Sequence, residues 1–157
     1  LAHAIGADGV HLGQSDLPVS AAREILGPEA TIGASVSTVS EARLAAITGA
    51  DYLGVGAVYG TDSKPDAESA DDALGLDRLA DIAAAVKLPV VAIGGVTPDN
   101  AAAAIEAGAS SVAVISAVTG ADDPAAAVSE LRAAVDDATT GDGDEETIVE
   151  TADADDD

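Results

Sequence analysis

Short apolar runs alternate with alanine-rich stretches of helical character along most of the chain. The apolar runs predict buried strands at about residues 9–13, 31–36, 52–58, 89–94 and 111–116. The stretches between and after them predict helices at about residues 18–27, 39–48, 75–86, 98–107 and 124–136, and the first residues are typical of the end of another helix. The chain therefore reads as repeated strand–helix units.

A recurring pattern marks the points where a helix is expected to pass into a strand. Gly-Ala, then Asp or Ser, then an apolar run begins at Gly6, Gly49 and Gly108. Glycine can take the left-handed conformation that ends a helix, so each copy is typical of the helix–turn–strand half of a βαβ unit. Thr38 with Glu41 three residues later has the spacing of a capping box at a helix start.

Strict alternation of strands and helices has two main solutions, an open doubly wound sheet or a closed parallel (β/α)8 TIM barrel. Five strands alone are compatible with a flavodoxin-like sheet, but the motifs described below favour the barrel. From residue 137 the chain is acidic and rich in Gly, Thr and Asp, without core-forming periodicity. We therefore expect one α/β domain at residues 1–136 and a disordered acidic tail at residues 137–157.

The charge balance narrows the classes of partner. The net charge is −23, and only 11 of the 29 acidic residues lie in residues 136–157, so the predicted domain is itself acidic. This balance disfavours nucleic acid, and two tyrosines as the only aromatic residues do not make a base-stacking surface. No apolar run is long enough to cross a bilayer and cysteine is absent, so we expect a cytoplasmic protein without membrane partners, disulfides or thiolate chemistry.

The strongest chemical signal lies where the fourth predicted strand ends. Gly94 and Gly95 follow that strand and precede a helix start, and Ser116 ends the next predicted strand. Glycines let a phosphate approach the backbone, a helix start offers free N–H groups, and barrels of this kind bind phosphate in the loops after their last two strands. The alternative is a pair of tight turns with no ligand.

Three further segments follow predicted strands and carry polar side chains. Lys64, one of only two lysines, lies on a loop where a cation would neutralise a phosphate or a leaving pyrophosphate; otherwise it is a solvated lysine. Asp16 is either a magnesium ligand or a helix cap, and local considerations favour the cap. Ser35 ends a strand and could donate to a phosphate oxygen. His11 is more typical of a hydrogen-bonded interior histidine than of a general base.

Taken together, these segments are similar to a known family. Over roughly residues 1–135 the chain resembles thiamine-phosphate synthase, in the segments 9–18, 32–35, 61–64, 91–97 and 114–117. The resemblance implies a TIM barrel and a magnesium-dependent transferase of thiamine biosynthesis. Its substrates would be two phosphorylated small molecules, a pyrimidine methyl diphosphate and a thiazole phosphate, which are joined with release of pyrophosphate.

The resemblance also implies individual roles. Asp16 matches a magnesium-ligating aspartate, which overrides the local preference for a cap. Ser35 and Lys64 match residues that contact the pyrimidine diphosphate, and Lys64 is the catalytic candidate. The thiazole phosphate would be bound by Gly95, Ile115 and Ser116 and by the loop that contains Thr61, Asp62 and Ser63.

The chain departs from the family pattern in ways that leave alternatives open. Ser63 replaces a usual threonine, and Gly60 stands where proline is common. The family's early Gln-x-Arg-x-Lys and Asn-Asp motifs are absent, so by this alignment the chain begins after the third strand and contains strands four to eight. A thiazole tautomerase of the same fold and an inactive phosphate-binding fragment, unstable by itself, remain alternatives, and a homo-oligomer remains open.

The acidic composition yields a first prediction. A strongly acidic surface with two lysines suits a high-salt cytoplasm, because screening at high ionic strength removes self-repulsion. We expect dialysis into millimolar salt to unfold the protein, as followed by circular dichroism. An ordinary acidic protein would keep its full spectrum under the same treatment.

Overall fold

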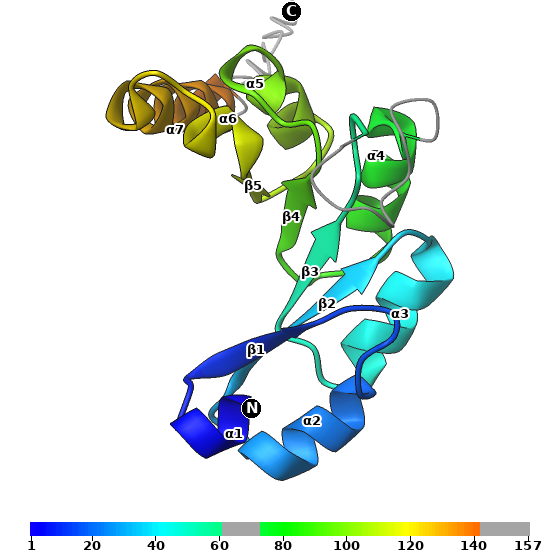
Figure 1. The fold of residues 1–157 in the computed structure, drawn as a ribbon. Helices are drawn as coiled ribbons and strands as arrows, with labels where there is room; N and C mark the ends of the chain where they lie inside the picture. Colours follow the sequence, from blue (N-terminus) through cyan, green and yellow to red (C-terminus); the bar gives the residue numbers. More distant parts are fainter. Residues whose placement is uncertain (61–72, 142–157) are drawn as a thin grey trace, which may run out of the picture.

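All five predicted strands are present, and they form one parallel sheet. A computed structural model of the chain describes residues 1–60 and 73–141. The strands are β1 (Gly9–Leu12), β2 (Thr31–Val36), β3 (Tyr52–Val55), β4 (Val90–Ile93) and β5 (Ser111–Ala113), paired in the order β1-β2-β3-β4-β5 (Figure 1). The architecture is therefore α/β, as predicted, with β1 and β5 at the edges of the sheet among the described residues.

The helices alternate with these strands. They are α1 (Ala2–Ile5), α2 (Val19–Leu26), α3 (Val39–Ile47), α4 (Leu76–Ala85), α5 (Pro98–Glu106), α6 (Ser116–Thr119) and α7 (Pro124–Gly141). Helices α2 to α5 lie along one side of the sheet, which gives the ribbon its arc-like outline (Figure 1). No helix within the described ranges is long and apolar enough to cross a membrane.

Three predicted boundaries were wrong. The third strand ends at Val55 rather than near residue 58. The backbone N–H groups of Val58 and Tyr59 instead donate to carbonyls at the end of β4 and just beyond it. The last strand ends at Ala113, and the short helix α6 follows it.

The third correction concerns the predicted tail. Helix α7 continues to Gly141, so residues 137–141 are helical where disorder was expected. The hydroxyl of Thr139 donates to the Val135 carbonyl at 2.8 Å, and Val135 itself packs against the buried cluster beneath α7. The packing of Val135 stabilises the helical turn that precedes residues 137–141, and α7 therefore continues into the acidic segment. Residues 142–157 lie outside the described part of the chain.

The two faces of the sheet differ sharply in chemistry. Side chains alternate between faces along a strand, and paired residues of neighbouring parallel strands share a face. The face covered by helices carries Leu12, Ile32, Ala34, Val36, Leu53, Val55, Val90 and Ala92, all of which are buried. The opposite face carries exposed or half-buried polar residues, namely His11, Thr31, Ser35, Tyr52 and Ser111. Its glycines include Gly33 and Gly54, which are buried.

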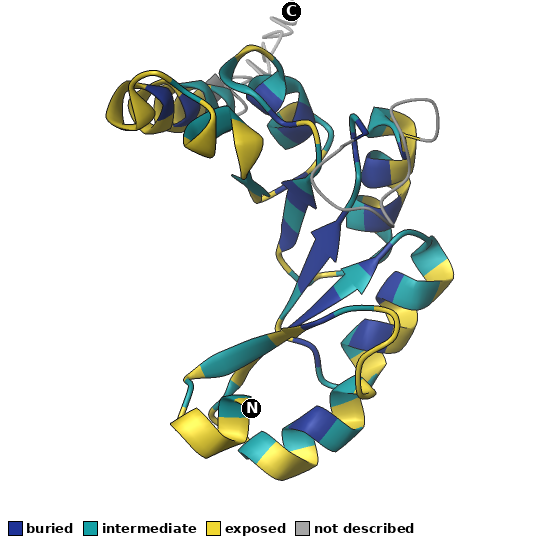
Figure 2. Ribbon diagram, in the orientation of Figure 1, coloured by how far each residue is buried: buried dark blue, intermediate teal, exposed yellow. Residues whose placement is uncertain are grey.

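The core is built from small aliphatic side chains, as the composition predicted. Its largest fully buried members are Ile32, Leu53, Leu79 and Ile82 with three valines. Alanines are the buried residues of α3 and α5, and the buried stripes of the helices face the strands (Figure 2). Small residues at these contacts let the helices approach the sheet closely, which suits a parallel sheet covered by crossover helices.

At the amino ends of the strands, Arg23 ties two helix-to-strand turns together. Its guanidinium forms an ion pair with Asp51 at 2.7 Å, and the same carboxylate oxygen accepts the Ile32 N–H at 2.7 Å. The guanidinium also donates to backbone carbonyls of both turns, those of Gly27, Pro28, Ala30 and Gly49. The pKa of Asp51 is held below its ordinary value, chiefly by the hydrogen bond from the Ile32 N–H and next by the Arg23 guanidinium.

Removal of this cation should therefore destabilise the fold. We expect Arg23→Ala to lower the free energy of unfolding by about 2 kcal/mol, since several carbonyls and a carboxylate lose a charged hydrogen-bond donor. Thermal unfolding followed by circular dichroism measures the change.

Arg43→Ala is the matched control, because Arg43 is exposed on α3 and has no hydrogen bond or ion pair to another described residue. Equal losses in the two variants would show that Arg23 contributes no more than its charge.

Candidate functional site

The carboxyl ends of the five strands meet at one edge of the sheet, because the strands are parallel. Segments bearing five of the predicted site residues lie along this edge. Asp16 follows β1, Ser35 is near the end of β2, Gly95 follows β4, and Ile115 and Ser116 follow β5. The other four predicted residues, Thr61, Asp62, Ser63 and Lys64, lie outside the described residues.

The turn after β4 requires both of its glycines. Gly94 and Gly95 have φ values of 93° and 68°, a region that side chains rarely adopt. A Cβ on Gly94 would lie 2.5 Å from the Cβ of Ala57, and one on Gly95 would lie 2.5 Å from the carbonyl oxygen of Gly60. Close packing against the neighbouring loop is thus sufficient to explain these glycines, whatever the turn binds.

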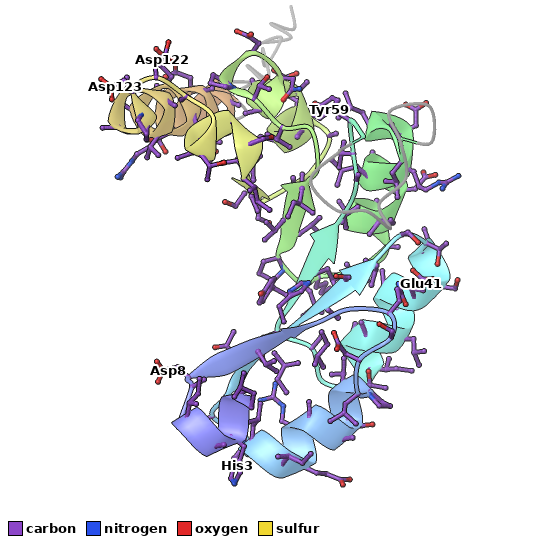
Figure 3. The ribbon with its side chains drawn as sticks, viewed as in Figure 1. His3, Asp8, Glu41, Tyr59, Asp122 and Asp123 are labelled. Atoms are coloured by element: carbon purple, nitrogen blue, oxygen red, sulfur yellow. The ribbon has the colours of Figure 1, made fainter. Side chains whose placement is uncertain are left out.

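Tyr59 and Asn100 hold this turn in place. The Tyr59 N–H donates to the Gly94 carbonyl at 3.0 Å, and the Asn100 amide donates to the Gly95 carbonyl at 3.0 Å. The Tyr59 hydroxyl donates to the Asn100 carbonyl at 2.8 Å, and burial raises the pKa of this phenol. Tyr59 belongs to the segment after β3 and lies beside α5 (Figure 3). Neither residue was predicted as part of the site; the scarcity of aromatic residues was the available signal for Tyr59.

The turn after β4 and the segment after β5 expose backbone donors at the edge. Gly95 and Ser116 are exposed, and Ile115 is 52% exposed. The backbone N–H groups of Gly95, Ser116 and Ala117 have no acceptor among the residues that the structure describes. Such groups can donate to the oxygens of an anion such as phosphate.

Asp16 does not cap the following helix, so the local preference for a cap was wrong. Its Oδ2 accepts the N–H of Gly13 at 2.7 Å and closes a turn. Helix α2 begins after Pro18 with no side-chain cap. Asp16 remains exposed, and an exposed carboxylate suits a hard cation such as Mg²⁺. Within the described ranges no three His, Cys, Asp or Glu residues cluster as a metal site, so Asp16 is a single ligand candidate.

Gln14 and Glu41 join the loops that carry Asp16 and Ser35. The Gln14 side chain donates to the Ser35 carbonyl and to the Glu41 carboxylate, both at 3.2 Å. That carboxylate also accepts the Ser37 N–H at 2.7 Å, and the Thr38 hydroxyl accepts the Glu41 N–H as the capping pattern predicted. Partial burial acts to raise the pKa of Glu41, but the hydrogen bonds that it accepts outweigh burial and lower it.

His11 is hydrogen-bonded, as expected, but it is exposed rather than interior. Its Nδ1 lies 3.0 Å from the Tyr52 hydroxyl oxygen, and its Nε2 lies 2.9 Å from Ser35 Oγ. The His11 and Tyr52 ring centroids are 5.5 Å apart. Tyr52 was not predicted as part of the site, because 41 positions separate it from His11.

Comparisons with known proteins identify relatives of this arrangement. A family model described as thiamine monophosphate synthase matches residues 1–118. Thiamine-phosphate synthases of Haloarcula marismortui and Natronomonas pharaonis are 61% and 60% identical over 136 residues, which is 87% of this chain and 64% and 63% of theirs. The solved thiamine phosphate pyrophosphorylase of Pyrococcus furiosus has a TM-score of 0.76 and 46% identity, covering 87% of this chain and 63% of that one. The chain thus spans less than two thirds of each relative.

The depressed pKa of Glu41 yields a prediction about acid stability. We expect Glu41→Gln to lower the free energy of unfolding by about 1 kcal/mol near neutral pH, since charge-assisted hydrogen bonds are lost. A depressed pKa stabilises the fold above the ordinary value of 4.5 and ceases to do so as pH falls through the folded-state value. The difference between wild type and variant should therefore shrink below about pH 4.5.

Denaturant unfolding at a series of pH values measures this difference. Glu130→Gln is the matched control, because Glu130 is exposed on α7. A Glu41→Gln deficit that stays constant down to pH 3 would contradict the role given to the charge.

Proposed function

The chain belongs to the thiamine monophosphate synthase family, and from this premise we propose that it carries thiamine-phosphate synthase activity. The reaction joins 4-amino-2-methyl-5-(diphosphooxymethyl)pyrimidine to thiazole phosphate and yields thiamine phosphate and pyrophosphate. We also propose that the five strands belong to a closed (β/α)8 barrel, which the likeness to the Pyrococcus furiosus protein supports.

The observation that carries the proposal is the composition of the edge where the strands end. Backbone N–H groups after β4 and β5 that have no acceptor among the described residues lie on segments that end at this edge. A hydroxyl on β2 and an exposed carboxylate after β1 lie on segments that end there too. Such a set suits two phosphorylated substrates and a hard cation. The proposed reaction needs no protein nucleophile, because the thiazole nitrogen is the attacking atom.

We assign the two substrates to different parts of the edge. Gly95, Ile115 and Ser116 bind the thiazole phosphate, together with Thr61, Asp62 and Ser63. Ser35 and Lys64 bind the pyrimidine diphosphate, and Asp16 would hold magnesium, which supplies positive charge to the diphosphate.

In the reaction, the bond between the pyrimidine methylene and the diphosphate oxygen breaks, and the thiazole nitrogen forms a bond to that methylene carbon. Pyrophosphate departs with the bonding electron pair. The ammonium of Lys64 neutralises the charge that develops on the leaving oxygen, while the remaining residues hold the two reacting atoms in line.

Two alternatives predict different results. A thiazole tautomerase of the same fold would move a proton and would not require a diphosphate site. The presence of both Asp16 and Lys64 in the sequence therefore favours the synthase. An inactive fragment would bind phosphate without turnover.

A pyrophosphate-release assay separates these alternatives. We expect the protein, expressed together with any coding sequence found upstream of Leu1, to release pyrophosphate only when both substrates and magnesium are present. Thiazole isomerisation without pyrophosphate release would identify a tautomerase, and phosphate binding alone would identify an inactive protein.

The role of Lys64 is tested in the same assay. We expect Lys64→Ala to lower kcat by about 10²-fold, since stabilisation of transition-state charge is lost. Lys87→Ala is the matched control: Lys87 is the other lysine of the chain, and it is exposed in the turn before β4, away from the carboxyl ends of the strands. Unchanged turnover in Lys64→Ala would remove Lys64 from the mechanism.

A further inference from the structure

Two rings lie over glycines on the face of the sheet that the helices leave uncovered. A Cβ on Gly33 would lie 2.5 Å from His11 Nδ1 and still closer to the Tyr52 ring, and one on Gly54 would lie 2.9 Å from His11 Cε1. Glycine inside a strand weakens it and often marks a close approach. Here the close approach is that of His11 and Tyr52, so the sheet is shaped to hold these rings.

The rings form a hydrogen-bonded chain that ends on Ser35. The Tyr52 hydroxyl oxygen lies 3.0 Å from His11 Nδ1, and His11 Nε2 lies 2.9 Å from Ser35 Oγ. A neutral imidazole has one nitrogen that donates and one that accepts, so the chain has two arrangements. In one, Tyr52 donates to Nδ1 and Nε2–H donates to Ser35. In the other, Ser35 donates to Nε2 and Nδ1–H donates to Tyr52.

The relative donor strengths of the two hydroxyls favour the first arrangement. Each arrangement leaves one hydroxyl hydrogen without an acceptor among the residues that the structure describes, that of Ser35 in the first and that of Tyr52 in the second. A phenol is more acidic than an aliphatic hydroxyl, so Tyr52 is the stronger donor to an imidazole nitrogen. The partner of one ring nitrogen selects the tautomer at the other.

We propose that Tyr52 and His11 are positioning residues that orient the hydroxyl of Ser35 toward the pyrimidine diphosphate. Tyr52 holds His11 in the Nε2–H tautomer, and Nε2–H occupies a lone pair of Ser35 Oγ. The Ser35 hydrogen is then directed away from the imidazole and is available to a substrate oxygen. Gln14 fixes the other side of the same residue by donating to the Ser35 carbonyl. This role for Ser35 rests on the proposed function.

The tautomer itself can be measured without any activity. The chain has two histidines, His3 and His11, and His3→Ala leaves a single imidazole for ¹⁵N NMR. At alkaline pH we expect a protonated Nε2 and a bare Nδ1, and we expect Tyr52→Phe to convert this state into a mixture of tautomers. Tyr52→Phe keeps the ring over Gly33 and removes only the hydroxyl. A protonated Nδ1, or a tautomer that Tyr52→Phe leaves unchanged, would overturn the proposal.

Kinetic measurements test whether the tautomer of His11 affects substrate binding by the Ser35 hydroxyl. In protein shown to release pyrophosphate, we expect Tyr52→Phe to lower kcat/KM for the pyrimidine diphosphate by about tenfold, as for one lost hydrogen bond. The KM for thiazole phosphate should not change. In a Ser35→Ala background, Tyr52→Phe should cause no further loss, because the group that it orients is gone. His3→Ala serves as the variant of unchanged activity.

The outcomes separate the two proposals. Equal losses from Tyr52→Phe with and without the Ser35 hydroxyl would overturn the positioning role while leaving the synthase intact. Absence of pyrophosphate release in the wild type would instead refute the proposed function, and the ¹⁵N measurement would still decide the tautomer.

Discussion

Parallel pairing of the strands is the constraint from which the rest of this molecule follows. The connection between two parallel strands must run from the end of one strand back to the start of the next. Here helices make these connections on one face of the sheet. The helix-covered face must then be apolar over its full extent, as Ile32, Leu53 and Val90 show. The same pairing places every strand-to-helix loop at one edge, so residues distant in sequence, such as Asp16 and Ser116, lie on segments that end there.

The two faces use small residues for different purposes. On the covered face, alanines of α3 and α5 let the helices pack closely on the strands. On the open face, Gly33 and Gly54 leave room for the rings of His11 and Tyr52. Gly94 and Gly95 belong to a third kind of contact, because they let one strand-to-helix loop rest on its neighbour. A chain almost without aromatic residues can in this way make both a dense core and a polar surface of defined shape.

Periodicity was sufficient to predict the five strands and the longer helices, because side chains buried against the helices recur regularly along each strand. It did not predict the four-residue helix α6. It failed at the end of β3, where carbonyls at and beyond the end of β4 redirect Val58 and Tyr59. Strand ends and the family resemblance located Asp16, Ser35, Gly95 and Ser116. They did not reveal the contact of Tyr52 with His11 or that of Glu41 with Gln14, because these partners lie far apart in sequence. Asp16 was locally ambiguous because its turn back to Gly13 has no signature of its own.

The position of Arg23 has a consequence for how such a protein can change. Its guanidinium joins two turns at the amino ends of the strands, opposite the edge that carries the candidate site. The interactions of Arg23 that stabilise the sheet thus lie at the end of the strands where no substrate is expected to bind. Loops at the opposite edge can then lengthen, shorten or exchange side chains without loosening that anchor. A scaffold arranged in this way is free to acquire new specificities by mutation, because robustness and chemistry are encoded at opposite ends of the same strands.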